Sequence, residues 1–157
     1  MKIKVVTADY YDIPNIIKLK ELLAEQSLCM AYTDILKEQD RTLAMDMYKH
    51  LSIYAVLKCH GYLQGYVSYS KVVNEAGYCY YIKIGIMKKF QHKGYGKLLL
   101  NYLLTLLKTL RKHSTLYAFI DENNVIALNL FKKFNFVLIP ADKHESILML
   151  KNTDLTN

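Results

Sequence analysis

The sequence predicts a mixed α/β (α+β) fold in which a mostly antiparallel central sheet carries helices on both faces. Strand-like and helix-like segments follow one another in the order β-α-α-β-β-β-α-β-α-β-β. Short glycine-containing turns join the three consecutive strands in the middle, which is typical of antiparallel hairpins. The 157 residues, 52% of them hydrophobic, suffice for one buried core, so we expect a single domain over residues 1–157.

Each element is predicted from its own residue pattern. Runs rich in β-branched and aromatic residues between turn residues indicate strands, and apolar residues that recur at a helical period indicate helices. The predicted strands cover residues 3–7, 51–57, 63–69, 78–86, 116–120, 136–139 and 146–151, and the predicted helices cover residues 13–25, 34–50, 94–112 and 124–134.

Polar residues mark the ends of the predicted helices. Asp12, Asp34 and Asn124 each stand where an N-cap side chain accepts a hydrogen bond from the first turn of a helix. Asn135 follows the last helix, where we expect the left-handed conformation that asparagine tolerates. The cations at residues 111–113 end the third helix, at the negative end of its dipole.

The junction between the strand at 78–86 and the next helix is a candidate phosphate cradle. Its residues are Gln91, His92, Lys93, Gly94, Tyr95, Gly96 and Lys97. N–H groups in the first turn of a helix have no intrahelical partner and lie at the positive end of the dipole, so they suit a phosphate. Gly94 and Gly96 would let the backbone approach it closely. A P-loop would need glycine in place of Gln91, and a dinucleotide-binding loop would need glycine in place of Leu99. The pattern that remains is Gln-x-x-Gly-x-Gly.

This pattern resembles the acyl-coenzyme A motif of the GNAT superfamily of N-acetyltransferases, which is Gln/Arg-x-x-Gly-x-Gly/Ala between a strand and a helix. The segment from Asn124 through Phe131 to Phe136 looks like the family's second motif, Asn-x-x-Ala-x-x-x-Tyr-x-x-x-Gly-Phe. Upstream, the residues at 84–86 occupy the strand end that in such enzymes separates from its neighbour and offers backbone groups to the pantetheine arm. The resemblance covers the C-terminal half of the chain, and the N-terminal half fits in its order of elements.

The resemblance implies that acetyl-coenzyme A (acetyl-CoA) is the co-substrate and that its acetyl group passes to a primary amine by direct attack in a ternary complex. It assigns to coenzyme binding Ile84, Gly85, Ile86, Gln91, His92, Lys93, Gly94, Tyr95, Gly96, Lys97, Asn124, Ala127 and Phe131. A backbone N–H near Ile86 would stabilise the oxyanion. The acceptor stays open between a polyamine, an aminoglycoside, an amino-acid derivative and a protein amine.

The groups that usually move protons in this family are missing from their expected positions. Phe131 stands where many relatives carry a tyrosine acid, and it has no proton to give. The strand segment 78–83 has no carboxylate, and the position of the glutamate in related enzymes aligns with Tyr80.

The candidate catalytic residues are therefore Tyr80, Tyr81 and Glu75. Tyr80 could relay a proton through water, although a pKa near 10 makes it a poor base, and Glu75 could act through a water chain, although an exposed turn residue is the more typical interpretation. Because side chains alternate along a strand, either Tyr80 or Tyr81 would line the acceptor channel while the other packs. A thiol has a pKa of about 8.5, so water can also protonate the departing thiolate. The same departures favour an alternative, a coenzyme-binding sensor with little turnover.

Five other side chains have a functional and a structural interpretation. His92 titrates near physiological pH, but its place in the phosphate turn favours contact with an anion over a role as base. Tyr32, Tyr66 and Tyr69 are candidates for an aromatic acceptor pocket. A lone Cys79 on a strand could accept an acyl group, but it is more typical of a small buried apolar residue.

Composition excludes several other classes of protein. The formal net charge is +7, but the lysines are spread out without an arginine-rich stripe, so we do not expect nucleic-acid binding. The three cysteines lack metal-ligand spacing, which indicates reduced thiols and no metal site. No apolar segment reaches the length of about 20 residues that a bilayer needs, and no signal-peptide pattern is present, so we expect a cytoplasmic protein. The exposed late strands are compatible with a homodimer.

Overall fold

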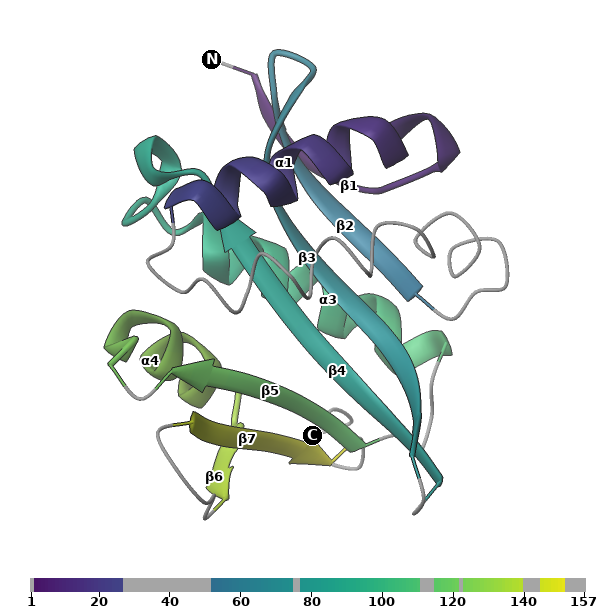
Figure 1. Ribbon diagram of the computed structural model, residues 1–157, viewed down its shortest axis with the longest axis vertical. Helices are drawn as coiled ribbons and strands as arrows, with labels where there is room; N and C mark the ends of the chain where they lie inside the picture. The colour runs from purple at the N-terminus through teal and green to yellow at the C-terminus, as the bar shows by residue number, and fades with distance from the viewer. Residues whose placement is uncertain are drawn as a thin grey trace.

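The computed structural model describes residues 2–26, 52–74, 77–110, 115–121, 123–139 and 145–151. Within these residues, seven strands form one sheet in the order β1-β2-β3-β4-β5-β7-β6 (Figure 1). Every neighbouring pair is antiparallel except β4 and β5, which run parallel. The predicted mixed and mostly antiparallel sheet is therefore confirmed.

The order of the described elements follows the predicted order. In sequence they are β1 (Ile3–Thr7), the 3-10 turn η1 (Tyr10–Asp12), α1 (Ile13–Gln26), β2 (Ser52–Cys59), β3 (Tyr62–Asn74), β4 (Gly77–Ile86), the 3-10 turn η2 (Lys88–Phe90), α3 (Tyr95–Leu110), β5 (Thr115–Asp121), α4 (Val125–Lys133), β6 (Val137–Ile139) and β7 (Glu145–Lys151). The helix predicted over residues 34–50, with Asp34 as its cap, and the cations at 111–113 lie outside the described residues.

Helices cover both faces of the sheet, with α1 in front of it and α3 behind it in Figure 1. On the α1 face, Ile16 and Leu19 are buried against aromatic and aliphatic side chains of β2 and β3. On the α3 face, the leucines of α3 share a larger core with β2 to β5 and with Phe131 of α4. Burying one such leucine stabilises the fold by about 1.5–3 kcal/mol, so these apolar stripes fix both helices on the sheet.

Two hairpins build the middle of the sheet. In the first, the turn residues His60 and Gly61 both have positive φ angles, +50° and +88°, which match the twist of the flanking strands. In the second, β3 and β4 pair without interruption from Gly65 opposite Ile86 to Asn74 opposite Gly77. The sequence prediction ended β3 at residue 69, because Ser70 and Lys71 interrupt the apolar alternation there.

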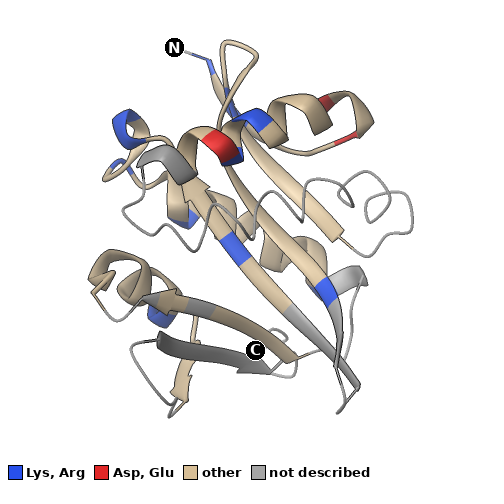
Figure 2. Ribbon diagram, in the orientation of Figure 1, with Lys and Arg blue, Asp and Glu red and all other residues tan. Residues whose placement is uncertain are grey.

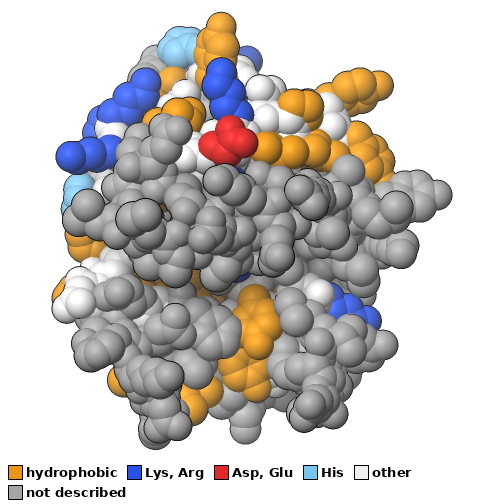
Figure 3. Space-filling view, in the orientation of Figure 1, with side chains coloured by type: hydrophobic (Ala, Val, Ile, Leu, Met, Phe, Trp, Pro, Cys, Tyr) orange, Lys and Arg blue, Asp and Glu red, His pale blue; other side chains and the backbone are white. Residues whose placement is uncertain are grey.

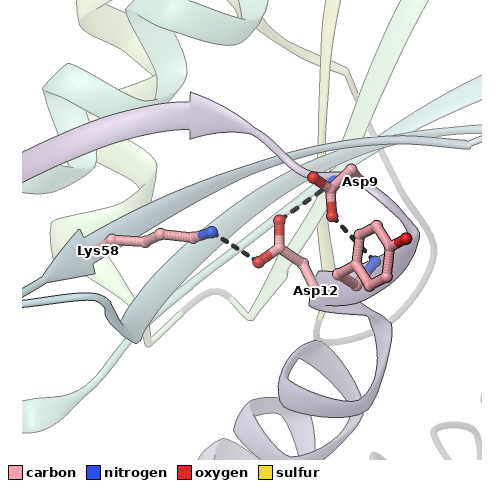
Figure 4. A network of polar contacts seen from close by, with 4 residues as sticks. Asp9, Asp12 and Lys58 are labelled. Carbon is pink, nitrogen blue, oxygen red and sulfur yellow. Dashed lines mark hydrogen bonds and ion pairs between the residues drawn. The ribbon is translucent and has the colours of Figure 1, made fainter.

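The start of α1 differs from the prediction that Asp12 caps this helix. Asp9 caps the 3-10 turn η1 that leads into α1: its Oδ1 accepts a hydrogen bond from the Tyr11 N–H at 2.9 Å, and Asp12 Oδ2 accepts from the Asp9 N–H at 3.1 Å (Figure 4). Asp12 Oδ1 lies 2.6 Å from Lys58 Nζ. Lys58 stands directly opposite Lys4 in the sheet, where two like charges repel, and the Asp12 carboxylate offsets that repulsion.

Two other end residues behave as predicted. The Asn124 Oδ1 accepts a hydrogen bond from the Ala127 N–H at 3.2 Å and so caps α4. Asn135 has a φ of +68°, the left-handed conformation expected after the helix. Both predictions are confirmed.

Candidate active site

Strands β4 and β5 separate along their length, and this separation creates the site. They pair only at Tyr80 with Leu116 and at Tyr81 with Tyr117, although β4 continues to Ile86. Figure 1 shows the two ribbons diverging from that point. Within the described residues, β4 from residue 82 onward therefore pairs with β3 alone, as predicted for the strand end at 84–86. Its other backbone edge can pair with an extended ligand as an added strand would.

The side chains of β4 alternate between the two faces of the sheet. Ile82, Ile84 and Ile86 pack in the α3 core, so Tyr81, Lys83 and Gly85 lie on the α1 face. A Cβ atom on Gly85 would stand 2.6 Å from Leu23 Cδ1 of α1 and 2.9 Å from the Tyr66 ring of β3. Gly85 thus allows α1 to cross the strand closely, a packing role in addition to its predicted place beside a ligand.

A buried phenylalanine anchors the turn that follows β4. The Phe90 N–H donates to the Met87 carbonyl at 2.8 Å, and the Met87 N–H donates to the Gln64 carbonyl of β3 at 2.9 Å. The Phe90 ring is buried, with its centroid 6.1 Å from that of Tyr95. The sequence analysis missed Phe90. Its signal is that it is the only non-tyrosine aromatic residue within the basic run at 88–97.

Gln91 holds the turn to the strand. Its Nε2 donates a hydrogen bond to the carbonyl oxygen of Ile86, the last residue of β4, at 2.9 Å. The side chain predicted to contact the coenzyme therefore also closes the turn, and it fixes where the next residues begin.

The two glycines of the turn have different roles. Gly94 has a φ of +82° and a Cβ there would meet nothing within 4 Å, so glycine is needed for the backbone conformation alone. Gly96 lies inside α3, and a Cβ there would stand 3.1 Å from Leu130 Cδ2 and 3.5 Å from Ile86 Cδ1. Gly96 therefore lets α3 pack tightly against α4 and β4, and its predicted approach to a phosphate stays a prediction.

The start of α3 presents free backbone donors. The first helical hydrogen bond runs from the Leu98 N–H to the Gly94 carbonyl at 3.2 Å, so the N–H groups of residues 95–97 precede the helical ladder and have no acceptor within it. His92 just before them has a φ of +58°, a left-handed conformation that the sequence analysis did not foresee. Both features fit an anion at the helix N-terminus.

Positive side chains surround these donors. Figure 2 shows Lys and Arg positions along the turn between β4 and α3, and Figure 3 shows their side chains projecting from that edge of the molecule. The exposed members of this group, which we call the turn lysines, are Lys88, Lys89, Lys93 and Lys97. No carboxylate interrupts residues 87–97. The donor set therefore suits a polyphosphate such as that of coenzyme A.

Helix α4 lies on the same face of the sheet as α3. Asn124 at its start is exposed, and the next two side chains, Val125 and Ile126, are 57% and 64% exposed. Phe131 is only 1% exposed and meets Phe136 edge to face, with ring centroids 5.0 Å apart. Phe131 therefore belongs to the core, and its place in the second motif has no surface from which an acid could act.

The candidate catalytic residues are only partly described. Tyr81 is half-buried, with its ring centroid 6.1 Å from that of Tyr117, at the last pair before the strands separate. Glu75 and Tyr32, and the side chains of Tyr80 and Cys79, lie outside the described part of the structure. Tyr66 and Tyr69 are fully buried on opposite faces of the sheet, so their rings belong to the two cores.

Two lysines on the α1 face were missed by the sequence analysis. Lys20 of α1 is 2% exposed; its Nζ donates to the Tyr54 hydroxyl at 2.6 Å and lies 5.0 Å and 5.8 Å from the Tyr54 and Tyr66 ring centroids. Lys83 is half-buried on β4, and its pKa is lowered by burial and by the charge of Lys20. A lysine within an amphipathic helix ordinarily indicates a solvated position, so the sequence carries no signal for Lys20.

The described residues also bear on metal binding and on membrane insertion. The described residues contain no group of three or more His, Cys, Asp or Glu side chains arranged to hold a metal ion. No helix among them combines the length and hydrophobicity that crossing a membrane requires.

Comparisons with known proteins agree with this geometry. Residues 19–136 match the model of the acetyltransferase (GNAT) family. No curated protein gives a match. Among solved structures, the chain is similar to an acetyltransferase of the GNAT family from Streptococcus pneumoniae, with a TM-score of 0.76 and 15% identity over 96% of this chain and 99% of that one.

Two further similar structures are of proteins with a named cofactor or substrate. The first is yncA from Salmonella typhimurium with its cofactor acetyl-CoA, with a TM-score of 0.73 and 15% identity over 96% of this chain and 94% of that one. The second is a spermidine N-acetyltransferase chimera from Vibrio cholerae and hSSAT, with a TM-score of 0.72 and 16% identity over 100% and 99% of the two chains. At these identities the likeness establishes a shared fold.

Proposed function

The chain belongs to the acetyltransferase (GNAT) family and is an acyltransferase, and from that premise we propose that it transfers the acetyl group of acetyl-CoA to a primary amine. The transfer proceeds by direct attack in a ternary complex. The observation that carries the proposal is the separation of β4 from β5 next to a helix N-terminus surrounded by lysines. It offers an extended backbone edge and an anion site in immediate succession.

Each part of the site has a partner on the coenzyme. The edge of β4 at residues 82–86 that faces away from β3 would pair with the amides of the pantetheine arm. The N–H groups of residues 92–97 would bind the pyrophosphate, and the turn lysines would add charge-assisted contacts. Gln91 and Phe90 position this turn, since one holds it to Ile86 and the other anchors it in the core.

The chain would contribute mainly position and electrostatics to the chemistry. The acceptor amine attacks the thioester carbonyl carbon, and a backbone N–H of the β4 edge stabilises the oxyanion. Carbon–sulfur cleavage then releases a thiolate whose conjugate thiol has a pKa of about 8.5, so water protonates it readily. This route needs no acid at the position of Phe131, which is buried.

The acceptor class is narrowed by the charge on the α1 face. One structural neighbour is described as a spermidine N-acetyltransferase chimera. In this chain burial and the charge of Lys20 lower the pKa of Lys83, so Lys20 contributes a positive potential at this face. A polycationic acceptor would meet that potential, so we favour an acceptor with a single amine.

The second candidate is a coenzyme-binding sensor with little turnover. Phe131 supports it, because the buried ring provides no proton donor where many relatives have one. The sensor predicts binding of acetyl-CoA without release of thiol when amines are added. The two functions therefore differ in whether free thiol is released when an amine is added.

The test combines calorimetry with acetyl-CoA and a thiol-release assay across a library of amines. The double variant Lys93→Glu/Lys97→Glu reverses two exposed charges at the turn, and Lys108→Glu reverses one at the other end of α3 as a control. We expect the double variant to lose acetyl-CoA binding and the control to retain it. Unchanged binding in the double variant would refute the turn as the coenzyme site, and binding without amine-dependent thiol release would establish the sensor.

A further inference from the structure

The α1 face of the sheet carries a pair of lysines beside the point where β4 leaves β5. Lys83 is the first residue beyond the last β4–β5 pair whose side chain lies on this face. It is also the only charged residue of β4, whose sequence Gly77–Ile86 contains no carboxylate and no histidine. Its backbone belongs to the same edge that the proposed function assigns to the pantetheine arm.

Lys20 is the charged neighbour that, in addition to burial, lowers the pKa of Lys83. Donation to the Tyr54 hydroxyl at 2.6 Å and the two ring faces at 5.0 Å and 5.8 Å all favour its ammonium form. Lys20 is fixed on α1 by burial, whereas Lys83 lies on β4 beyond its last pair with β5.

The titratable groups on this face are few in the described residues. Cross-strand from Lys83 stands Ser68, which is buried and does not titrate. On this face the described elements carry Lys20 of α1, Tyr54 of β2, Tyr66 of β3, Tyr81 of β4 and Tyr117 of β5, and the Asp12–Lys58 ion pair lies where α1 begins. At neutral pH, tyrosines are uncharged and the ion pair is neutral as a whole, so the Lys20 ammonium sets the sign of the potential that these described groups create at Lys83.

We propose that Lys83 is the proton acceptor that converts the acceptor ammonium into the attacking amine. The inference rests on the proposed function. It supplies the base that the missing strand carboxylate would otherwise provide. A lysine suits this task when burial and a neighbouring cation bring its pKa down toward the working pH, and both act on Lys83.

The proton balance closes without another reactant. The uncharged Lys83 Nζ takes one proton from the acceptor ammonium, and the freed amine forms a bond to the thioester carbonyl carbon. The tetrahedral adduct expels the thiolate, which takes the second proton of the attacking nitrogen, by way of water. Lys83 then returns its proton to solvent, so the net products are the acetylated amine, the free thiol and one proton.

The expected pH dependence follows from the sign of the shift. Because the pKa of Lys83 is lowered, its uncharged form becomes available at a pH below that of an ordinary lysine. The value of kcat/KM for an alkylamine should therefore rise with pH, level off below the pKa of the acceptor and fall above it. Without the base, kcat/KM should follow only the uncharged fraction of the acceptor. It should then rise until the pH reaches the acceptor's pKa, about 10.4 for a lysine-like amine.

The experiment compares two small acceptors of similar size, ethylamine and hydroxylamine, with the uncatalysed rate subtracted. Ethylamine is an ammonium ion at neutral pH, and hydroxylamine is uncharged. Lys83→Arg carries a permanent positive charge and cannot give up its proton, and Lys108→Arg on the exposed end of α3 is the control. We expect Lys83→Arg to lower kcat/KM for ethylamine by about 100-fold and to leave hydroxylamine unchanged.

Three controls keep the outcomes separate. Calorimetry with acetyl-CoA shows whether the Lys83→Arg protein binds the coenzyme, and its thermal unfolding shows whether it is folded. Carbon-13 NMR of the lysine Cε groups follows the titration of Lys83 directly, with the signal assigned by its loss in Lys83→Arg. Lys20→Met should move that titration to higher pH.

Equal losses with both acceptors, or full activity in Lys83→Arg, would overturn the proton-acceptor role, as would a Lys83 titration at the ordinary lysine value. A wild-type protein that fails to bind acetyl-CoA would refute the proposed function and this inference together. A protein that turns over ethylamine equally well with Lys83 or Arg would refute this inference alone.

Discussion

Gly94 and Gly61 offer a matched pair of substitutions that separates backbone strain from a role in coenzyme binding. Both glycines have a positive φ, +82° and +88°, and a Cβ at either position meets no atom within 4 Å. One stands at the start of α3 and the other at the tip of the β2–β3 hairpin. Glutamate at either place therefore introduces the same strain and the same charge, at two different sites.

The structure sets the size of both effects. A side chain in the left-handed region costs about 1–2 kcal/mol, so Gly94→Glu and Gly61→Glu should lose similar stability in urea unfolding. At Gly94 the new carboxylate also repels the pyrophosphate. At about 5 Å, Coulomb's law gives roughly 1–3 kcal/mol between the dielectric of water and that of a protein surface. The Kd for acetyl-CoA should then rise by roughly 5- to 150-fold in Gly94→Glu.

Calorimetry with acetyl-CoA measures this difference, and Gly94→Gln removes the charge while keeping the strain. The Kd of Gly61→Glu for acetyl-CoA should equal that of the wild type. The Kd of Gly94→Gln should lie between those of the wild type and Gly94→Glu. Raising the salt concentration toward about 1 M shortens the screening length to about 3 Å and should bring Gly94→Glu close to Gly94→Gln. The reasoning fails if Gly94→Glu and Gly61→Glu share one Kd, because the turn would then make no contact with the phosphates.

Three further substitutions test other parts of the site. Gly85→Val should destabilise the protein by about 1–3 kcal/mol in urea unfolding, because its Cβ would stand 2.6 Å from Leu23 Cδ1; a wild-type midpoint would show that α1 does not cross there. Gln91→Leu should weaken acetyl-CoA binding by about 1 kcal/mol in calorimetry through loss of the 2.9 Å bond to the Ile86 carbonyl, while the salt dependence stays unchanged. Phe131→Tyr should lower stability by about 1–3 kcal/mol without raising thiol release, because the new hydroxyl enters a core with 1% exposure; a faster enzyme would contradict the buried position.

The part of the site that is built from backbone could be predicted from the sequence. A glycine turn between a strand and a helix indicates free N–H groups whatever the surrounding fold, and the observed start of α3 after Gly94 agrees with it. Asn124 and Asn135 were predictable for the same reason, since each acts on residues within a few positions of itself. Interactions between residues that are close in the chain can therefore be predicted from the local sequence.

Features that depend on distant residues could not be predicted in this way. A side chain at Gly96 would crowd Leu130, and one at Gly85 would crowd Leu23. Both contacts exist only after α3, α4 and α1 are packed. Asp12 looked like a cap because it precedes a helix, but its carboxylate meets Lys58, 46 positions away. Lys20 has the least sequence signal of all, since only the tertiary fold places it under two tyrosine rings.

The alternation of β4 divides the site into two independent parts. On the α3 face, Ile84 and Ile86 pack near Gly96, so this face fixes the turn that holds the coenzyme. On the α1 face, Tyr81 and Lys83 lie where β4 leaves β5, the side on which we propose that the acceptor binds. A substitution on one face leaves the packing of the other unchanged, because successive side chains of a strand point in opposite directions. Acceptor preference can therefore change without loss of the coenzyme site, and for that reason motifs that describe the coenzyme side carry no information about the acceptor.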